Sequence, residues 1–289
     1  MRKLSTEKRA MILHALVEGN SINATSRMCG CSKITVLRLL ADAGTFCAEY
    51  HDEHVRNLQC ERVQMDEIWS FVGCKDKTKK HGAGGHGSVW TWVAIDADTK
   101  LVASYLMGER DAQTAHDFVS DLHDRIDSRI QLTSDGFGMY REAVDRAFDG
   151  HVDYAMVIKE FGWDGSPDTR YSPPACVGVK KRLMCGAPDK DHVSTSLVER
   201  QNLTLRMGSR RFTRLTNAFS KKVENHAHAI ALHYFYYNFC RKHQTIKTTP
   251  AVAMGVADRA LTIIDLVGMI EKEESRIGGR ITDYLPATA

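Results

Sequence analysis

The sequence lacks the patterns of a secreted or membrane-bound protein. No apolar run approaches the roughly 18 to 20 residues that a membrane-spanning helix needs, and the charged N-terminal stretch MRKLSTEKRAMILHALVEG is unlike a signal peptide. The eight cysteines include no C-x-x-C pair and no secretory-type spacing, which favours reduced thiols. We therefore expect a soluble cytoplasmic protein with no membrane partner.

The chain also lacks a strong net charge. Its 39 Lys and Arg against 36 Asp and Glu give a formal charge of +3, which says little about partners. The length of 289 residues and the 43% apolar content allow one large domain or two modest ones. Local charge is more informative, because residues 200–223 contain seven Lys or Arg and no acid. This asymmetry indicates a polyanionic partner.

The first 56 residues predict a helix-turn-helix module. Residues 5–18 have helical apolar spacing, with Ser5 or Thr6 as a cap and a stop at Gly19-Asn20. A short helix then precedes a break at Gly30 and a second helix capped by Ser32, whose apolar residues are Ile34, Val36, Leu37 and Leu40. Such a second helix can lie in the DNA major groove. The residues expected to face DNA are Lys33, Thr35 and Arg38, and the alternative is a helical bundle that binds nothing.

A β-sheet is predicted after a polar connector at 48–62. The segment RVQMDEIWSFVG alternates, with Val63, Met65, Trp69 and Phe71 on one face and Arg62, Gln64, Asp66 and Ser70 on the other. Residues 89–108 predict two further strands around the turn DADTK, so the three strands form an antiparallel meander. The loop KDKTKKHGAGGHGS between the first two strands is basic and glycine-rich.

Helices and strands then alternate. We expect a helix from residue 111, a strand over 129–135, a short helix over 140–148, a strand over 152–161 and helices from about residue 196. Residues 160–192 hold four glycines and four prolines and are expected to be an irregular insertion. The prediction is an α/β fold: a mixed five-stranded sheet flanked by helices over 60–240, with a C-terminal helical extension at 241–289.

Three acids stand out in this pattern. Asp66 lies within a strand, Asp135 ends another strand before a glycine, and Glu199 lies in the first turn of a helix. A buried carboxylate is costly without compensation, and a divalent cation is one compensating partner. Paired cations can activate an attacking oxygen and stabilise the leaving oxygen in a displacement at phosphorus. The three acids therefore suit phosphoryl-transfer chemistry.

Each acid also has a structural interpretation. Asp66 can pair with Arg62, and Asp135 before Gly136 is a good turn residue. Glu199 follows Ser196 by three residues, so SLVE reads as a capping box. Spacing alone leaves both interpretations open.

Longer motifs resemble a known family. VQMDEIWSFVG, VWTWVAIDADTKLVASYL, QLTSDGFGMY, the segment from STSLVERQNLTLRMGSRRFTRL to HYFYYNF, and RKHQTIKTTPAVAMG are together similar to DDE transposases of the insertion-sequence-one-like group. The resemblance covers roughly residues 1–260, and the combination is more specific than a short motif. It implies a ribonuclease H-like fold, with Asp66, Asp135 and Glu199 as the catalytic acids that bind two Mg²⁺ or Mn²⁺ ions.

The resemblance also implies a basic residue two helical turns after the glutamate, here Arg206. Positions i and i+7 share a helix face, so Glu199 and Arg206 are expected to point the same way. The arginines of this basic segment would hold DNA while the acids carry out the chemistry. These DNA-binding candidates are Arg206, Arg210, Arg211 and Arg214.

The C-terminal part resembles the YN..R.H......TP ending of many transposases and integrases, through Tyr237, Asn238, Arg241, His243 and Thr249-Pro250. A packed helix end is the alternative, and we prefer it for the tyrosines. The family prototype has an N-terminal cysteine zinc finger, which this chain lacks. Cys29 and Cys31 are too close in sequence to serve as its zinc ligands. Cys176, Cys185 and His192 are a weak candidate for a zinc site.

We therefore expect a DNA transposase that hydrolyses element ends and joins the freed 3′-hydroxyls to target DNA, as a homodimer or larger assembly on the nucleoid of a bacterium or archaeon. One rival is a non-catalytic DNA-binding regulator derived from a transposase, and another is a ribonuclease H-type nuclease. If Glu199 is only a cap, the third ligand would be Glu67 or Asp96.

Overall fold

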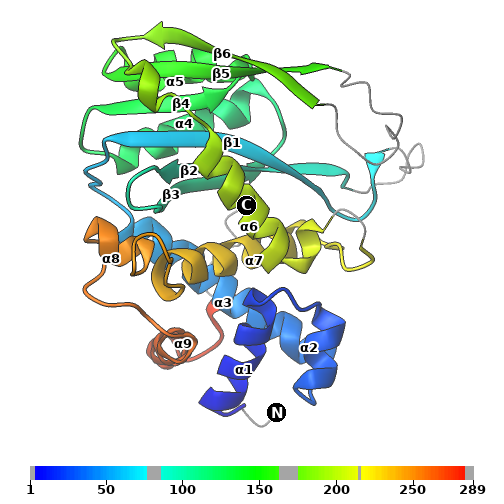
Figure 1. The fold of residues 1–289 in the computed structure, drawn as a ribbon. Coiled ribbons are helices and arrows are strands. Elements are labelled where there is room, and N and C mark those ends of the chain that lie inside the picture. Colours follow the sequence, from blue (N-terminus) through cyan, green and yellow to red (C-terminus); the bar gives the residue numbers. More distant parts are fainter. Residues whose placement is uncertain (1–3, 77–85, 163–174, 214–215, 284–289) are drawn as a thin grey trace.

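A six-stranded mixed sheet forms the centre of the molecule (Figure 1). The computed structural model describes residues 4–76, 86–162, 175–213 and 216–283. The strand order is β3-β2-β1-β4-β5-β6, in which β1, β4 and β5 are parallel and the other neighbours are antiparallel. The strands are β1 (Arg62–Phe71), β2 (Ser88–Asp96), β3 (Val102–Gly108), β4 (Ile130–Asp135), β5 (Val152–Gly162) and β6 (Ala175–Cys185).

Five of these strands match the predicted ribonuclease H-like arrangement, and β6 is an addition. It lies within residues 160–192, where we expected an irregular insertion, so that expectation is wrong for Ala175–Cys185. The strand pairs with β5 at the edge of the sheet and leaves Val177 and Val179 exposed. An exposed edge strand does not need alternating apolar residues, which is why its sequence did not reveal it.

Helices cover both faces of the sheet. One face packs against α4 (Ala112–Arg125) and α5 (Met139–Phe148), where Met65 and Trp92 lie in the same core as Phe118. The other face packs against α6 (Ser196–Gly208) and α7 (Val223–Phe235), where Ile68 meets Val198. Strand β1 is therefore covered on both faces, so its consecutive side chains enter different cores.

The N-terminal helices are α1 (Thr6–Val17), α2 (Ile22–Met28) and α3 (Lys33–His54). The predicted caps are confirmed, because the Ser5 and Ser32 side chains accept hydrogen bonds from the first turns of α1 and α3. Two expectations are wrong. Ile34 is 63% exposed rather than packed, and α3 continues through much of the polar connector predicted at 48–62.

The long α3 joins the N-terminal helices to the rest of the protein. At Gly44 it crosses α7 so closely that a Cβ atom would lie 2.4 Å from the Cα of His228. Helix α1 packs against α9 (Ile263–Ile277), where the Arg9 guanidinium pairs with Glu274 at 2.6 Å. The expected units 1–56 and 241–289 thus pack against each other (Figure 1).

The remaining helical elements are short. They are the 3₁₀ turns η2 (Lys190–His192), η3 (Arg210–Phe212) and η5 (Ile281–Asp283), the π-helical turn η4 (Tyr236–Cys240) and α8 (Pro250–Met254). Asn238 in η4 bonds both backbone groups of Val102 on the edge strand β3, at 3.0 and 2.9 Å. Across the described ranges, no helix combines the length and apolarity that crossing a bilayer requires.

Candidate active site

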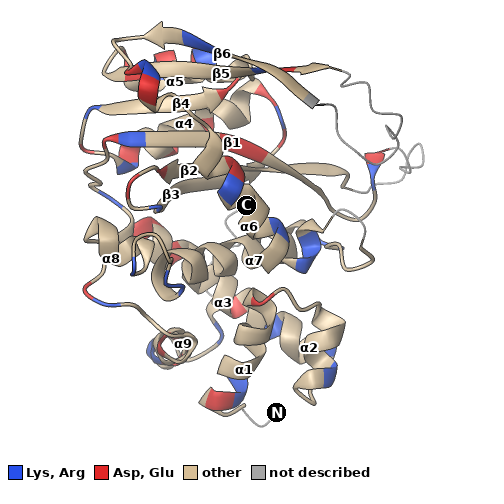
Figure 2. Cartoon of the chain, in the orientation of Figure 1, with Lys and Arg blue, Asp and Glu red and all other residues tan. Residues whose placement is uncertain are grey.

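Three carboxylates meet where β1 passes the end of β4. One oxygen from each of Asp66, Glu67 and Asp135 lies within 4.8 Å of the others. Met65 is the register partner of Ser134, so the next residues on the two parallel strands are Asp66 and Asp135. Figure 2 shows acidic residues on β1 next to α6. In the part of the chain that the structure describes, no other three His, Cys, Asp or Glu side chains bring their ligand atoms this close together.

Burial and mutual repulsion disfavour the charged forms of these acids. The pKa of Asp66 is raised to about 7, mainly by burial and then by Asp135, Glu67 and Glu199. Burial also raises the pKa of Asp135, and burial together with Asp135 raises that of Glu67. A divalent cation would relieve this repulsion, and carboxylate oxygens are the ligands that Mg²⁺ and Mn²⁺ accept. The donor set therefore fits a hard divalent cation.

Hydrogen bonds orient the carboxylates. Asp66 Oδ2 accepts from the side-chain amide of Asn202 on α6 at 2.9 Å, and Asp135 Oδ1 accepts from the backbone N–H of Phe137 at 3.0 Å. On the opposite face of β1, Glu67 accepts from the Tyr140 hydroxyl at 2.9 Å and from Arg110 Nε at 2.6 Å. Both oxygens of Glu67 thus already have protein donors.

The alternative pairing of Asp66 with Arg62 is wrong. Arg62 forms its ion pair with Asp98 instead. The fallback ligand Asp96 holds the turn between β2 and β3, because it accepts from the backbone N–H and the hydroxyl of Thr99 at 2.7 Å each. Cys176 and Cys185 stand near opposite ends of β6, too far apart for one zinc ion.

Glu199 lies at the rim of the acidic group rather than inside it. The capping box with Ser196 does not form, because Thr195 is the N-cap and Ser196 is already helical. Instead Glu199 Oε1 accepts from the Thr195 hydroxyl at 2.5 Å and forms an ion pair with Lys159 of β5. Glu199 contributes to the raised pKa of both Asp66 and Asp135, so it is electrostatically part of the site.

Two positioning residues were missed by sequence reasoning. Gln64 Oε1 accepts from the backbone N–H groups of Leu197 and Val198 at 2.9 and 3.3 Å, which fixes the start of α6 on β1. Lys159 reaches Glu199 because Val157, two residues earlier, pairs with Asp135. Gln64 was recognisable as a polar residue on the Asp66 face, whereas Lys159 depends on the register of β4 and β5.

The predicted DNA-facing residues fall into two groups. On α3, Lys33, Ile34 and Arg38 are exposed, while Thr35 is half-buried and its hydroxyl bonds that of Ser32 at 2.9 Å. These residues lie on the first turns of α3, on a different element from each of the carboxylates.

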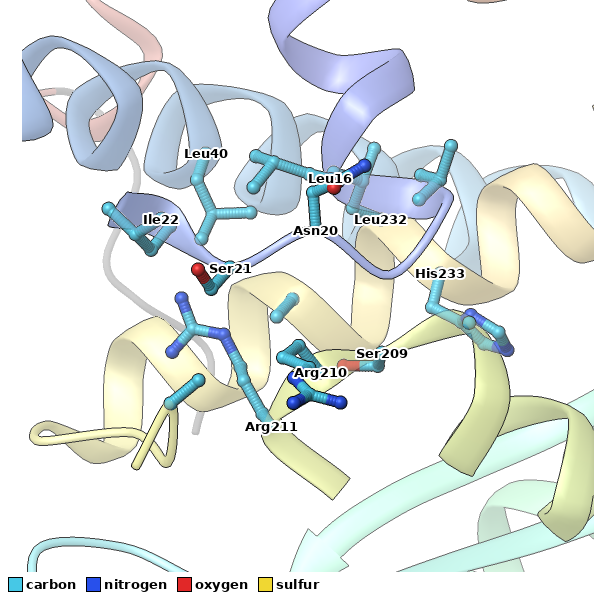
Figure 3. A pocket seen from close by; sticks show the side chains of 14 residues that line it. Leu16, Asn20, Ser21, Ile22, Leu40, Ser209, Arg210, Arg211, Leu232 and His233 are labelled. Atoms are coloured by element: carbon cyan, nitrogen blue, oxygen red, sulfur yellow. The ribbon is translucent and has the colours of Figure 1, made fainter. Parts of the chain in front are cut away.

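The second group lies at the end of α6, where Figure 2 shows basic residues beside α7. Arg206 is half-buried and Arg210 is exposed. The Arg211 side chain turns inward toward Ser21 (Figure 3), so it does not lie on the open surface with Arg210. Arg214 lies outside the described residues.

Part of this chain is similar in sequence to IS1 transposases. Residues 58–157 match the family model described as IS1 transposase. The insertion element iso-IS1n protein InsB of Shigella dysenteriae is 27% identical over 177 residues, which are 60% of this chain and 96% of that protein. Among solved structures, a piggyBac transposase synaptic complex with hairpin DNA aligns with 100% of this chain and 79% of its own, at a TM-score of 0.42 and 9% identity.

Proposed function

We propose that this chain, which resembles IS1 transposases over residues 58–157 and is 27% identical to an InsB protein, cleaves the ends of an insertion element by metal-dependent hydrolysis and joins the 3′-hydroxyls to target DNA. The observation that supports this chemistry best is the meeting of Asp66 and Asp135 from separate strands, with raised pKa values and Glu199 at the rim. Repelling carboxylates at a sheet end favour cation binding and add little to the stability of the fold.

We assign Asp66, Asp135 and Glu199 as the residues that hold two Mg²⁺ or Mn²⁺ ions. When bound, such ions supply positive charge at the phosphodiester, which favours attack by water or a hydroxyl and departure of the leaving oxygen. Asn202 orients the Asp66 carboxylate, and the Phe137 N–H orients that of Asp135. Glu67, held by Tyr140 and Arg110, contributes negative charge beside the ligands.

DNA recognition is assigned to the N-terminal part of α3 and to the end of α6. Lys33 and Arg38 are exposed and can reach bases or phosphates, Thr35 lies between them, and exposed Ile34 can contact a thymine methyl group. Arg206 and Arg210 would hold the DNA backbone at the end of α6 that lies away from the acids. Within this proposal the chain acts as a homodimer or larger assembly on the nucleoid of a bacterium or archaeon.

Conservative replacement of the acids tests the catalytic assignment. Asp66→Asn, Asp135→Asn and Glu199→Gln should each bind end DNA and fold like the wild type but lose strand cleavage by orders of magnitude, since a neutral amide replaces an anionic ligand poorly. Glu142→Gln is the control, because this exposed acid lies on α5 and pairs with Arg146. Cleavage is scored on flanking DNA with Mg²⁺, Mn²⁺ or Ca²⁺. Near-normal cleavage by Glu199→Gln would remove Glu199 from the ligands, and wild-type end binding without cleavage would favour the non-catalytic regulator.

A further inference from the structure

The side chain of Arg211 is half-buried with a fully buried Nη2 atom, and among the described residues it has no acidic partner. Two buried arginines are neutralised by contrast: Arg9 pairs with Glu274 at 2.6 Å, and Arg125 pairs with Asp121 at 2.8 Å. Arg211 has no ion pair among the described residues, and burial lowers its pKa to about 10. An uncompensated buried charge is costly, so the site favours an anion that the protein itself does not supply.

A buried hydrogen-bond chain fixes this guanidinium. Arg211 Nη1 donates to Ser220 Oγ at 2.7 Å, and that hydroxyl lies 2.8 Å from His226 Nδ1. On the other side of the ring, His226 Nε2 lies 3.0 Å from Ser70 Oγ, whose hydroxyl donates to the Val89 carbonyl at 3.0 Å.

The donor and acceptor roles in this series of hydrogen bonds follow from Ser70 at its end. Because the Ser70 hydroxyl proton goes to a carbonyl, Ser70 accepts from His226 Nε2–H. Burial lowers the His226 pKa to about 3, so the ring is neutral and Nδ1 accepts the Ser220 hydroxyl. Ser220 therefore accepts from Arg211. The guanidinium is held in place on its Nη1 side, while Nη2 is buried and makes no hydrogen bond with any residue that the structure describes.

A small cavity lies beside Arg211. It has a volume of about 40 Å³ and lies between the turn that joins α1 to α2, the end of α6 and helix α7 (Figure 3). Its polar lining includes Ser21, Ser209 and Arg210, and no acidic residue is among the described residues that line it. His233 also lines the cavity, is 4% exposed, and has no hydrogen bond at either ring nitrogen.

We propose that this cavity is a binding site for a phosphate group, held by Arg210 and Arg211. A guanidinium matches the oxygens of a phosphate, and the preset position of Arg211 reduces the conformational cost of binding. The cavity volume of about 40 Å³ leaves room for oxygen atoms the size of a water molecule. Within the proposed function the phosphate belongs to the DNA backbone, and its place between the α1–α2 turn and α6 would tie the bound end to both parts of the protein.

The first test uses the DNA-free full-length protein with inorganic phosphate. At constant ionic strength, millimolar phosphate in place of chloride should raise the unfolding temperature of the wild type by several degrees. Arg211→Met should lose this shift, and in phosphate-free buffer it should be no less stable than the wild type because it removes an uncompensated charge. Arg146→Met, at an exposed arginine on α5, should keep the shift. If Arg211→Met does not fold, Arg210→Met should reduce the shift instead. The absence of a wild-type shift, or a shift that the cavity variants leave intact, would overturn the site.

The second test identifies the source of the phosphate. Single neutral methylphosphonates placed along the end DNA should weaken wild-type binding at one position that no longer matters in Arg211→Met. If no such position exists while the inorganic phosphate shift persists, the DNA assignment is overturned and the ligand is a free phosphate. Neither measurement uses cleavage, so a failure of the proposed catalytic function would be distinguishable from a failure of this site.

Discussion

Replacing Lys159 by Met should tighten cation binding at the carboxylates. Lys159 forms an ion pair with Glu199, so the substitution releases the glutamate and removes one positive charge from the site. The side chains of Lys159 and Glu199 are 33% and 39% exposed, which places the pair between water-like and interior screening. Two unit charges about 4 Å apart interact by about 1 kcal/mol in water and by about 4 kcal/mol near a protein surface.

Solvent screening favours the lower part of that range, so we expect a gain of about 1.4 kcal/mol, which corresponds to about tenfold. Titration of Mn²⁺ into the DNA-free protein by calorimetry measures this gain directly. Lys180→Met is the matched control, because Lys180 lies on the edge strand β6 and pairs with Glu160 of β5 rather than with any of the three acids.

A double-mutant comparison isolates the role of Glu199. In a Glu199→Gln background, the effect of Lys159→Met should shrink, since the carboxylate that it would release is already absent. Unchanged Mn²⁺ affinity in Lys159→Met would refute the reasoning. It would mean either that Glu199 is not a cation ligand or that the ion pair does not restrain it.

Three further predictions concern pH, packing and recognition. The Asp66 pKa is raised from its ordinary value of 3.8 to about 7, so the cation-free protein should lose about 1 to 3 kcal/mol of unfolding free energy as the pH rises from about 4 to 7. Urea unfolding should show this slope, Asp66→Asn should flatten it, and a flat wild-type profile would contradict the raised pKa. Gly44→Ala should destabilise by about 1 to 3 kcal/mol because its Cβ would meet the His228 backbone, whereas Gly268→Ala, whose Cβ meets nothing within 4 Å, should be neutral or stabilising; equal unfolding midpoints would disprove the close crossing. Arg38→Ala should weaken end binding by about 1 to 3 kcal/mol if it reads a base, and equal losses on end DNA and random DNA in competition assays would show that it contacts only phosphate.

Much of the fold could be predicted from local patterns. The β1 alternation, the Ser5 and Ser32 caps and the β2–β3 turn depend on nearby residues, and the structure confirms them. The insertion-sequence-one-like resemblance is confirmed as well. Strand β6 was missed because its pairing with β5 provides backbone hydrogen bonds without burying an apolar face. The C-terminal half of α3 looked like a connector because the residues that it packs against on α7 are distant in sequence.

The candidate site also contains residues that could be predicted from the sequence and residues that could not. Asp66 and Asp135 were recognisable as acids at positions where a strand normally carries apolar residues or ends. Glu67 was considered only as a fallback ligand, and in the structure it lies on the face of β1 opposite to Asp66. The structure nonetheless brings one of its carboxylate oxygens within 4.8 Å of ligand oxygens of Asp66 and Asp135. Lys159 was not predictable, because its contact with Glu199 needs both the β4–β5 register and the placement of α6.

Helix α6 connects the carboxylate site to the turn between α1 and α2. Its first turn is fixed on β1 by Gln64 and carries Glu199, while its last turn packs under the turn between α1 and α2. There Gly19 has a φ of +79°, and a Cβ atom would lie 2.9 Å from the Met207 carbonyl oxygen, so the contact needs glycine for both its backbone conformation and its lack of a side chain. Thirteen helical residues span about 20 Å. Helix α6 therefore links the contact with the α1–α2 turn at its last turn to Glu199 and its ion pair with Lys159 at its first turn.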